Sequence, residues 1–246
     1  MVGEPPAALS SHRMPTPEVT LVIPCFNEAR RLATTFAGID RLPSIVTDVV
    51  LVDDGSTDDT LALLTALAAE RAHVRVETGP HRGKGGAVRA GVLSSQAAWV
   101  CFADADWSVP PEGVLDFLPP RAPVADVLVA TREGAASRRL GEPRHRHVLG
   151  RAFNAWVRAM ALPGLQDSQC GFKAFRGDVA RELFGALVTT GWAFDVEVLR
   201  RAQLAGLRVE EVPVVWTHDA DSRVRVGRDA LGMAAAVVRI RRMLPG

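Results

Sequence analysis

The sequence predicts an α/β protein built on a mostly parallel central sheet. Short β-branched runs alternate with longer segments of helical pattern, as they do in doubly wound sheets. Several of these runs end in carboxylates, at the strand ends where open α/β sheets bind ligands. The 246 residues suit one large domain or two small ones, and 48% hydrophobic with 23% charged residues is a soluble globular composition.

Composition narrows the function classes. A net charge of +1 creates no global attraction to nucleic acid. Three distant cysteines without a C-x-x-C pair indicate a reducing compartment and no zinc site. Residues 1–18 lack the layout of a secretory signal and are expected to form a flexible tail. Because no uncharged apolar run reaches the ~20 residues of a membrane span, we expect a cytoplasmic chain whose membrane contact is at most peripheral, at the inner face.

The first predicted strand covers residues 19–23 and stops at Pro24. A helix should follow and end near Gly38. Asn27 is a suitable N-cap for this helix, and Glu28 is favourable near its positive end. Capping alone therefore accounts for both polar residues.

The second predicted strand, residues 48–52, ends in Asp53 and Asp54. Ser56 and Asp59 resemble a capping box for the next helix. That interpretation leaves the two adjacent aspartates unexplained. Their place at the carboxyl end of a strand favours a ligand site.

A third predicted strand, residues 73–77, leads into the glycine-rich segment 79–87. The segment fails the P-loop pattern because Gly85 follows Lys84 where Ser or Thr should stand, and Val88 replaces the third glycine of a dinucleotide fingerprint. Glycines still allow a backbone to approach a ligand, with Lys84 as a charge beside it. A flexible turn with a solvated lysine explains the segment equally well.

A short apolar run ends at Asp104 and Asp106, ahead of Ser108 and a helix predicted from Pro111 to Leu118. On an extended backbone this spacing points both carboxylates to the same side. Two carboxylates and a substrate diphosphate are enough to hold Mg²⁺ or Mn²⁺. The alternative is that the pair merely ends a strand and caps the next helix.

Residues 132–158 form a basic segment, with seven arginines and two histidines against two glutamates. It is followed by an apolar helix that contains Phe153, Trp156, Met160 and Leu162. A solvated loop explains the charges, but arginines also match phosphate geometry, and the pairing suits anionic lipid headgroups. The last predicted helix, residues 229–243, is too short to span a bilayer; its terminal arginines fit interfacial anchoring or, slightly better, ordinary capping.

Further polar residues lie between the predicted C-terminal elements. Residues 165–175 read as a turn followed by alternating apolar positions, and residues 191–199 open a helix. Asp195 lies near the start of that helix, where the dipole explains it. After the strand predicted at 209–216, the polar loop 218–224 is placed to fold over a site.

Together these segments resemble glycosyltransferase family 2 with the GT-A fold, and within it the dolichyl-phosphate β-glucosyltransferases and their bacterial polyprenyl-phosphate relatives. The resemblance covers residues 19–226, with 227–246 as a C-terminal helix, and the Q-C-G-F-K element favours the glucosyl branch over the mannosyl branch. Ser108 replaces the glutamine often found in the mannosyl branch. The segments that carry the resemblance, in order, are Ile23–Glu28, Val52–Ser56, Gly83–Ala87, Asp104–Asp106, Asp167–Lys173 and Trp192–Glu197.

The resemblance implies a role for each group of residues. The nucleotide-sugar would be bound by Pro24, Phe26, Glu28, Asp53, Asp54, Lys84, Asp104 and Ala105. Asp104 and Asp106 would hold Mg²⁺ or Mn²⁺ on the diphosphate, and Asp106, Arg132 and Asp195 would carry the reaction. The sugar and acceptor would meet Gln169, Lys173, Trp192, Glu197 and Arg223.

The implied activity is inverting transfer of a hexose, glucose from UDP-glucose, onto a polyprenyl phosphate at a membrane surface. The departing diphosphate needs a metal and cations to stabilise its charge. A lipid phosphate, with its second pKa near ~6, is largely ionised and needs no strong base. A hydroxyl acceptor would need one, and Asp195 is the candidate. A soluble acceptor, GDP-mannose as donor and a non-catalytic nucleotide-sugar sensor remain alternatives.

Overall fold

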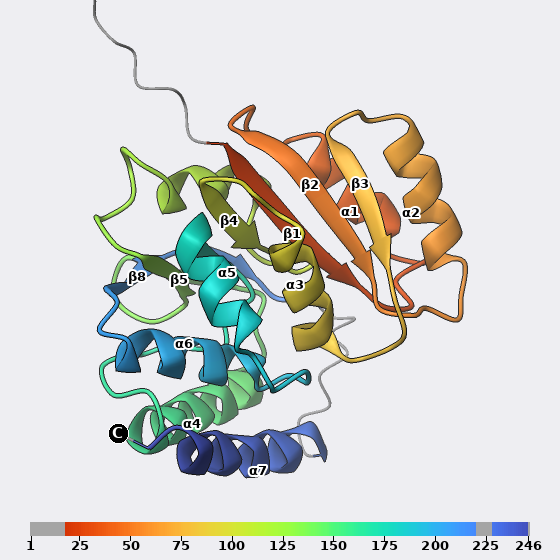
Figure 1. Ribbon diagram of the computed structural model, residues 1–246. Helices are drawn as coiled ribbons and strands as arrows, with labels where there is room; N and C mark the ends of the chain where they lie inside the picture. Colours follow the sequence, from red (N-terminus) through yellow and green to blue (C-terminus); the bar gives the residue numbers. More distant parts are fainter. Residues whose placement is uncertain (1–17, 220–227, 246) are drawn as a thin grey trace, which may run out of the picture.

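A seven-stranded sheet forms the centre of the computed structural model, which describes residues 18–219 and 228–245 (Figure 1). The strand order is β3-β2-β1-β4-β7-β5-β8. Only β7 runs antiparallel to its neighbours in this sheet, β4 and β5. The mostly parallel sheet that the sequence predicts is therefore confirmed. The strands are β1 (Val19–Cys25), β2 (Val46–Asp53), β3 (Val74–Thr78), β4 (Trp99–Phe102), β5 (Val127–Thr131), β7 (Lys173–Arg176) and β8 (Val209–Pro213).

Helices cover both faces of the sheet (Figure 1). One face packs against α1 (Leu32–Ile39), α2 (Thr60–Ala69) and the 3₁₀ segment η1 (Pro111–Phe117). The other packs against α3 (Lys84–Leu93), α5 (Gly177–Gly185) and α6 (Phe194–Leu204). Buried strands such as Val49–Val52 contribute alternate side chains to the two cores, because successive side chains point to opposite faces.

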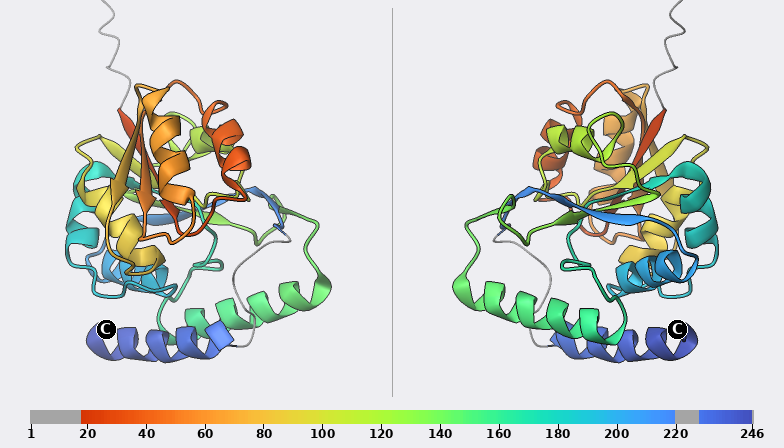
Figure 2. Two further views of the ribbon diagram at one scale, coloured as in Figure 1. Left: turned by 90° about the vertical axis from the view of Figure 1, so that its right-hand side faces the viewer. Right: turned by 90° about the vertical axis from the view of Figure 1, so that its left-hand side faces the viewer.

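The helices α4 (Arg144–Met160) and α7 (Arg228–Met243) lie side by side at one end of the molecule, beyond α6 (Figures 1 and 2). Along α4, only Asn154 and Val157 are buried. Val237 and Ile240 are the buried residues among the described side chains of α7. This pair of helices is thus attached to the body by narrow apolar stripes.

Two predicted helix caps are wrong. The structure starts α1 at Leu32 and not at Asn27, whose φ of 51° is left-handed and whose Oδ1 accepts a hydrogen bond from the Thr57 N–H at 2.7 Å. The side chain of Ser56 binds the Asn27 N–H at 2.8 Å instead of capping α2. The loops after β1 and β2 therefore satisfy each other's hydrogen-bonding groups.

The strand predicted over residues 209–216 is also divided. Its first part is β8, and its last residues belong to β9 (Val215–Thr217), which pairs with β6 (Arg138–Leu140) in a separate two-stranded sheet. Residues 111–117 form a 3₁₀ segment in place of an α-helix. The predicted tail lies outside the described residues except for Glu18.

Candidate active site

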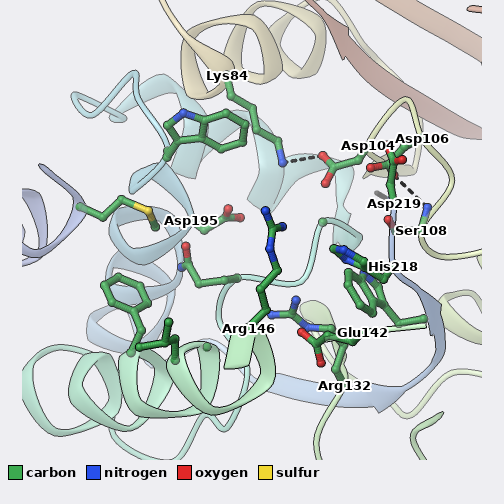
Figure 3. Close-up of a pocket in the computed structure, with 18 residues that line it drawn as sticks. Lys84, Asp104, Asp106, Ser108, Arg132, Glu142, Arg146, Asp195, His218 and Asp219 are labelled. Atoms are coloured by element: carbon green, nitrogen blue, oxygen red, sulfur yellow. Dashed lines mark hydrogen bonds and ion pairs between the residues drawn. The ribbon is translucent and has the colours of Figure 1, made fainter. Parts of the chain in front are cut away.

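A cavity of about 290 Å³ lies between the end of β4 and helix α4 (Figure 3). We call the side formed by Lys84, Asp104, Asp106 and Ser108 the strand-end wall. The side formed by Arg146, Leu149, Gly150 and Phe153 is the α4 wall. Seven residues predicted to act at the site line this one cavity: Lys84, Asp104, Asp106, Arg132, Gln169, Trp192 and Asp195.

The aspartate pair lies in a turn after β4, and the extended backbone assumed for it is wrong. This turn is fastened to α1. Trp107, at a left-handed φ of 52°, donates its Nε1–H to the Thr35 carbonyl at 3.0 Å. In return, the Thr35 hydroxyl donates to the carbonyl of buried Ala105 at 2.8 Å. These bonds fix the backbone that carries the two carboxylates.

Gly171 of the Q-C-G-F-K element gives Asp104 its room. A Cβ added at Gly171 would lie 2.0 Å from Asp104 Oδ2, so any side chain there would displace the carboxylate. The glycine lines the cavity beside it. Two segments far apart in sequence thus meet through one close approach.

The strand-end wall concentrates charge. Lys84 Nζ lies 2.5 Å from Asp104 Oδ1, and the Ser108 N–H donates to Asp106 Oδ1 at 2.9 Å. Burial, together with the charge of Asp104, raises the pKa of Asp106. Burial alone would lower the pKa of Lys84, but the carboxylates of Asp104 and Asp195 outweigh it and raise that pKa. The lysine therefore stays protonated.

The donor atoms on this wall suit a hard divalent cation. Carboxylate oxygens are preferred ligands of Mg²⁺ and Mn²⁺, and a bound cation would compensate the charge that Asp104 and Asp106 impose on each other. Among the described residues, no group of three or more His, Cys, Asp or Glu side chains forms a complete metal site. A diphosphate would have to supply further oxygens.

Asp195 and Lys173 form a buried ion pair beneath the cavity. Lys173 Nζ lies 2.7 Å from Asp195 Oδ1 and donates to the Cys170 carbonyl at 2.8 Å. Burial raises the pKa of Asp195, although Lys173 and Lys84 oppose the shift. Lys173 itself is fully buried and does not line the cavity. Its contact is with Asp195, which does line it.

Arg132 is held by a second buried pair. Its Nε and Nη2 donate to the two oxygens of Asp167 at 2.7 and 2.9 Å, and its guanidinium lies 5.2 Å from the Trp216 ring centre. Burial would raise the pKa of Asp167, but Arg132 holds it below its usual value. Asn154 of α4 also donates to Asp167, at 3.1 Å. Sequence reasoning assigned no role to Asp167.

Several residues that were predicted to bind the nucleotide lie together at the ends of β1 and β2, next to the residues that line the cavity. Phe26 stacks on His81 with ring centres 4.1 Å apart. Asp54 accepts from the Arg82 and Gly83 N–H groups, both at 2.8 Å. Buried Asp53 Oδ1 has no hydrogen-bond donor among the described residues. This oxygen is buried and keeps an unused acceptor position.

Three residues that were predicted to bind the nucleotide or the acceptor make contacts that stabilise the fold. Pro24 pairs with Val52 in the β1–β2 register. Glu28 accepts from Arg31 at 2.7 Å. Glu197 accepts from the Val188 and Thr189 N–H groups and is not part of the cavity lining. Arg223 lies outside the described residues.

Arg146 is a charged cavity residue that sequence reasoning did not single out. Arg146 points from α4 into the cavity (Figure 3). It was one of seven arginines in a basic segment, and nothing in the pattern singled it out. His218 and Asp219 begin the polar loop that was expected to fold over the site, and both line the cavity.

The fold has clear counterparts among solved structures. A glucosyl-3-phosphoglycerate synthase from Mycobacterium tuberculosis, in complex with Mn²⁺, UDP-glucose and phosphoglyceric acid, superposes with a TM-score of 0.67 at 20% identity, covering 91% of this chain and 79% of that one. A mycobacterial protein gives 0.69 at 20% identity, covering 91% and 74%. These likenesses confirm the GT-A fold.

Sequence relatives agree. Glycosyltransferase AglD of Haloferax volcanii is 33% identical over 90% of this chain, which spans only 36% of AglD. The dolichyl-phosphate β-glucosyltransferase of Drosophila melanogaster is 33% identical over 87% of this chain and 74% of that protein; the one of Dictyostelium discoideum is 28% identical over 91% and 73%. The family model for glycosyl transferase family 2 matches residues 20–184. The chain belongs to glycosyltransferase family 2.

Proposed function

We propose that this chain transfers glucose from UDP-glucose to a polyprenyl phosphate with inversion at the anomeric carbon. The observation that carries the proposal is the cavity itself, which is lined by the Asp104–Asp106 pair and by Arg146, an arginine without an ion pair among the described residues. The names of the relatives support the lipid acceptor, and the M. tuberculosis complex supports UDP-glucose and Mn²⁺.

The strand-end wall would bind the donor diphosphate. A Mg²⁺ or Mn²⁺ ion held by Asp104 and Asp106 would neutralise charge on the leaving diphosphate. Lys84, which remains protonated beside Asp104, adds a second positive charge there. The base and ribose would lie toward Phe26 and Asp53, next to the ring that stacks on His81.

The α4 wall would bind the acceptor phosphate. The Arg146 guanidinium has no ion pair or side-chain hydrogen bond among the described residues, so it is available for a phosphate, which arginine forks match. Arg132 has committed its Nε and Nη2 to Asp167 and would contribute its remaining face. An ionised phosphate attacks without a strong base. Attack opposite the leaving group gives a β-linked product from an α-linked donor.

The α4–α7 pair would face the membrane. Exposed Val148, Leu149 and Met160 lie on α4 together with exposed Arg144 and Arg151, a mixture that suits an anionic lipid surface. No helix among the described residues is long and apolar enough to cross a membrane. Contact at the cytoplasmic membrane face would therefore be peripheral for this part of the chain.

A soluble hydroxyl acceptor is the second candidate. Asp195 lines the cavity with a raised pKa and would act as the general base that such an acceptor requires. The phosphoglyceric acid in the M. tuberculosis complex favours keeping this candidate. A nucleotide-sugar sensor would bind UDP-glucose without releasing UDP.

The test measures transfer of labelled glucose from UDP-glucose, with Mn²⁺, to polyprenyl phosphate in mixed micelles and to soluble hydroxyl acceptors. We expect a metal-dependent glucosyl lipid that migrates with a β-linked standard. Transfer to soluble acceptors alone would establish the second candidate. A panel of UDP-, GDP- and dTDP-sugars in thermal-shift measurements identifies the donor, because a ligand of the native state raises Tm.

A further inference from the structure

A second cavity, of about 480 Å³, lies between the loop 188–193 and helix α7. It shares two lining residues, Trp192 and Met233, with the catalytic cavity. These two side chains therefore stand at the boundary between the two spaces. A molecule whose reacting end lies in the first cavity can extend past them into the second. We call the second cavity the α7 groove.

The loop side of the α7 groove is firmly held. The carboxylate of fully buried Glu197 accepts from the Val188 and Thr189 N–H groups at 3.0 and 2.7 Å. The Thr190 carbonyl accepts from the Gly86 N–H at 3.1 Å. A Cβ added at Gly85 would lie 2.9 Å from that carbonyl oxygen, so the glycines that open α3 permit this approach. The groove wall is thus formed before any ligand arrives.

The chemistry of the α7 groove differs from that of the catalytic cavity. No acidic residue lines it among the described residues, and Arg239 is its one charged lining side chain. Large apolar side chains are left exposed along it: Val188 at 65%, Trp192 at 41% and Met243 at 39%. Ile240, which is buried, contributes to its lining from α7. Contiguous exposed apolar surface of this kind marks a ligand groove or an interface.

We propose that the α7 groove binds the isoprenoid chain of the acceptor, next to its phosphate. This inference rests on the proposed function, because it assumes an acceptor whose phosphate lies in the catalytic cavity. Continuity through Trp192 and Met233 supplies the path, and the apolar, acid-free lining supplies the match to an uncharged hydrocarbon. The enzyme would then select prenyl phosphates over phosphates without a chain.

The experiment compares two monomeric, water-soluble acceptors, farnesyl phosphate and dimethylallyl phosphate, which share the headgroup and differ in chain length. The variant carries Val188→Asp and Met243→Asp, both at exposed positions along the groove. The control is Val124→Asp, at a valine that is 83% exposed and lies outside both cavities. Tm and the Kd for UDP-glucose report whether the variants keep the fold and the donor site.

We expect the wild type to have a higher kcat/KM for farnesyl phosphate, and the variant to raise KM for that acceptor about tenfold, the scale of losing contact with about two methylene groups. Its kinetics with dimethylallyl phosphate and its donor Kd should match those of Val124→Asp. Equal losses with both acceptors, or no chain-length preference in the wild type, would overturn the inference. So would a defect seen only with acceptor embedded in vesicles, which would make the surface a membrane contact. If the wild type glucosylates no prenyl phosphate, the proposed function fails as well.

Discussion

The strand-end wall and the α4 wall of the candidate active-site cavity differ in how their charged side chains are held. On the first, Asp104 is paired with Lys84, and Asp106 accepts the Ser108 N–H. On the second, the guanidinium of Arg146 has no ion pair or hydrogen bond among the described residues. The backbones of the two walls also differ in how firmly they are held. Hydrogen bonds of Trp107 and Thr35 fasten the aspartate turn to α1, whereas α4 is attached to the body only by a narrow stripe of apolar side chains.

This contrast is what a transferase with two substrates requires. Charge developing on a leaving diphosphate is best stabilised by groups that are already oriented, because no reorganisation is then needed during the reaction. The wall that receives a second substrate has to bind and release it. Because Arg146 has no ion pair among the described residues, a substrate phosphate would supply one, and in the proposed function the binding energy would go into acceptor recognition.

The substitution with the largest expected effect on the strand-end wall is Asp106→Asn, which removes one of its two carboxylates. We expect kcat for metal-dependent transfer to fall about 10³-fold, the upper range for removing one electrostatic stabiliser from an active site. Tm without metal should not fall, because burial and Asp104 already raise the pKa of Asp106 and disfavour its charge. The exposed Asp116→Asn is the control. Full activity in Asp106→Asn would remove the metal from the proposed reaction.

The buried Asp167–Arg132 pair is anchored to α4, because Asn154 of that helix also donates to Asp167. Asp167→Asn should lower the free energy of unfolding by about 3 kcal/mol, since it leaves a buried guanidinium without its countercharge. The control Asp178→Asn, at an exposed pair with Arg176, should cost less than about 1 kcal/mol. Urea denaturation measures both changes.

The same pair has a defined pH dependence. The pKa of Asp167 is lower in the folded protein than in the unfolded chain, where it is about 3.9. Its contribution to stability is therefore present above that unfolded value and is lost as the pH falls toward the folded value. Acidification below pH of about 4 should reduce the unfolding free energy more steeply in the wild type than in Asp167→Asn. Parallel curves would contradict the assignment.

The sheet could be predicted from the sequence because its strands are continuous apolar runs. The helix caps could not be predicted in the same way. Asn27 and Ser56 have the residue types and spacings of local caps, yet they bind across to each other's loops. Propensity describes a residue and its sequence neighbours. It gives no warning that two loops about 30 residues apart will meet. With Asn27 bound to the second loop, α1 starts only at Leu32.

The residues of the candidate site also fall into those that the sequence predicted and those that it did not. Asp104 and Asp106 were found because their spacing after a strand suits a shared cation and several other segments of the sequence indicate the same ligand. Arg146 was missed because the basic residues of α4 occupy several faces, and only the packing of Asn154 and Val157 decides which face meets the cavity. Lys173 was assigned to the sugar, but its β-strand position buries it beneath Asp195. Residue type is visible in the sequence, and orientation is not.

Gly171→Ala tests whether the position of Asp104 matters apart from its charge. The added Cβ would lie 2.0 Å from Asp104 Oδ2, so the carboxylate has to move. We expect kcat to fall about 10²-fold, the scale for a displacement of about 1 Å in an active site. Gly185→Ala, where no atom lies within 4 Å of the added Cβ, is the control and should keep full activity. Wild-type kcat in Gly171→Ala would show that the wall tolerates movement.

Arg146→Ala addresses the other side of the comparison and has the smallest expected effect. Loss of one phosphate contact should raise KM for the lipid acceptor about tenfold, which corresponds to about 1.4 kcal/mol. The Kd for UDP-glucose should not change, because the proposed function places the donor on the opposite wall. Arg144→Ala removes an exposed arginine from the same helix without touching the cavity, so it controls for loss of general basic charge. If Arg146→Ala weakens donor and acceptor binding equally, the two walls do not divide the substrates, and the phosphate assigned to Arg146 belongs to the nucleotide.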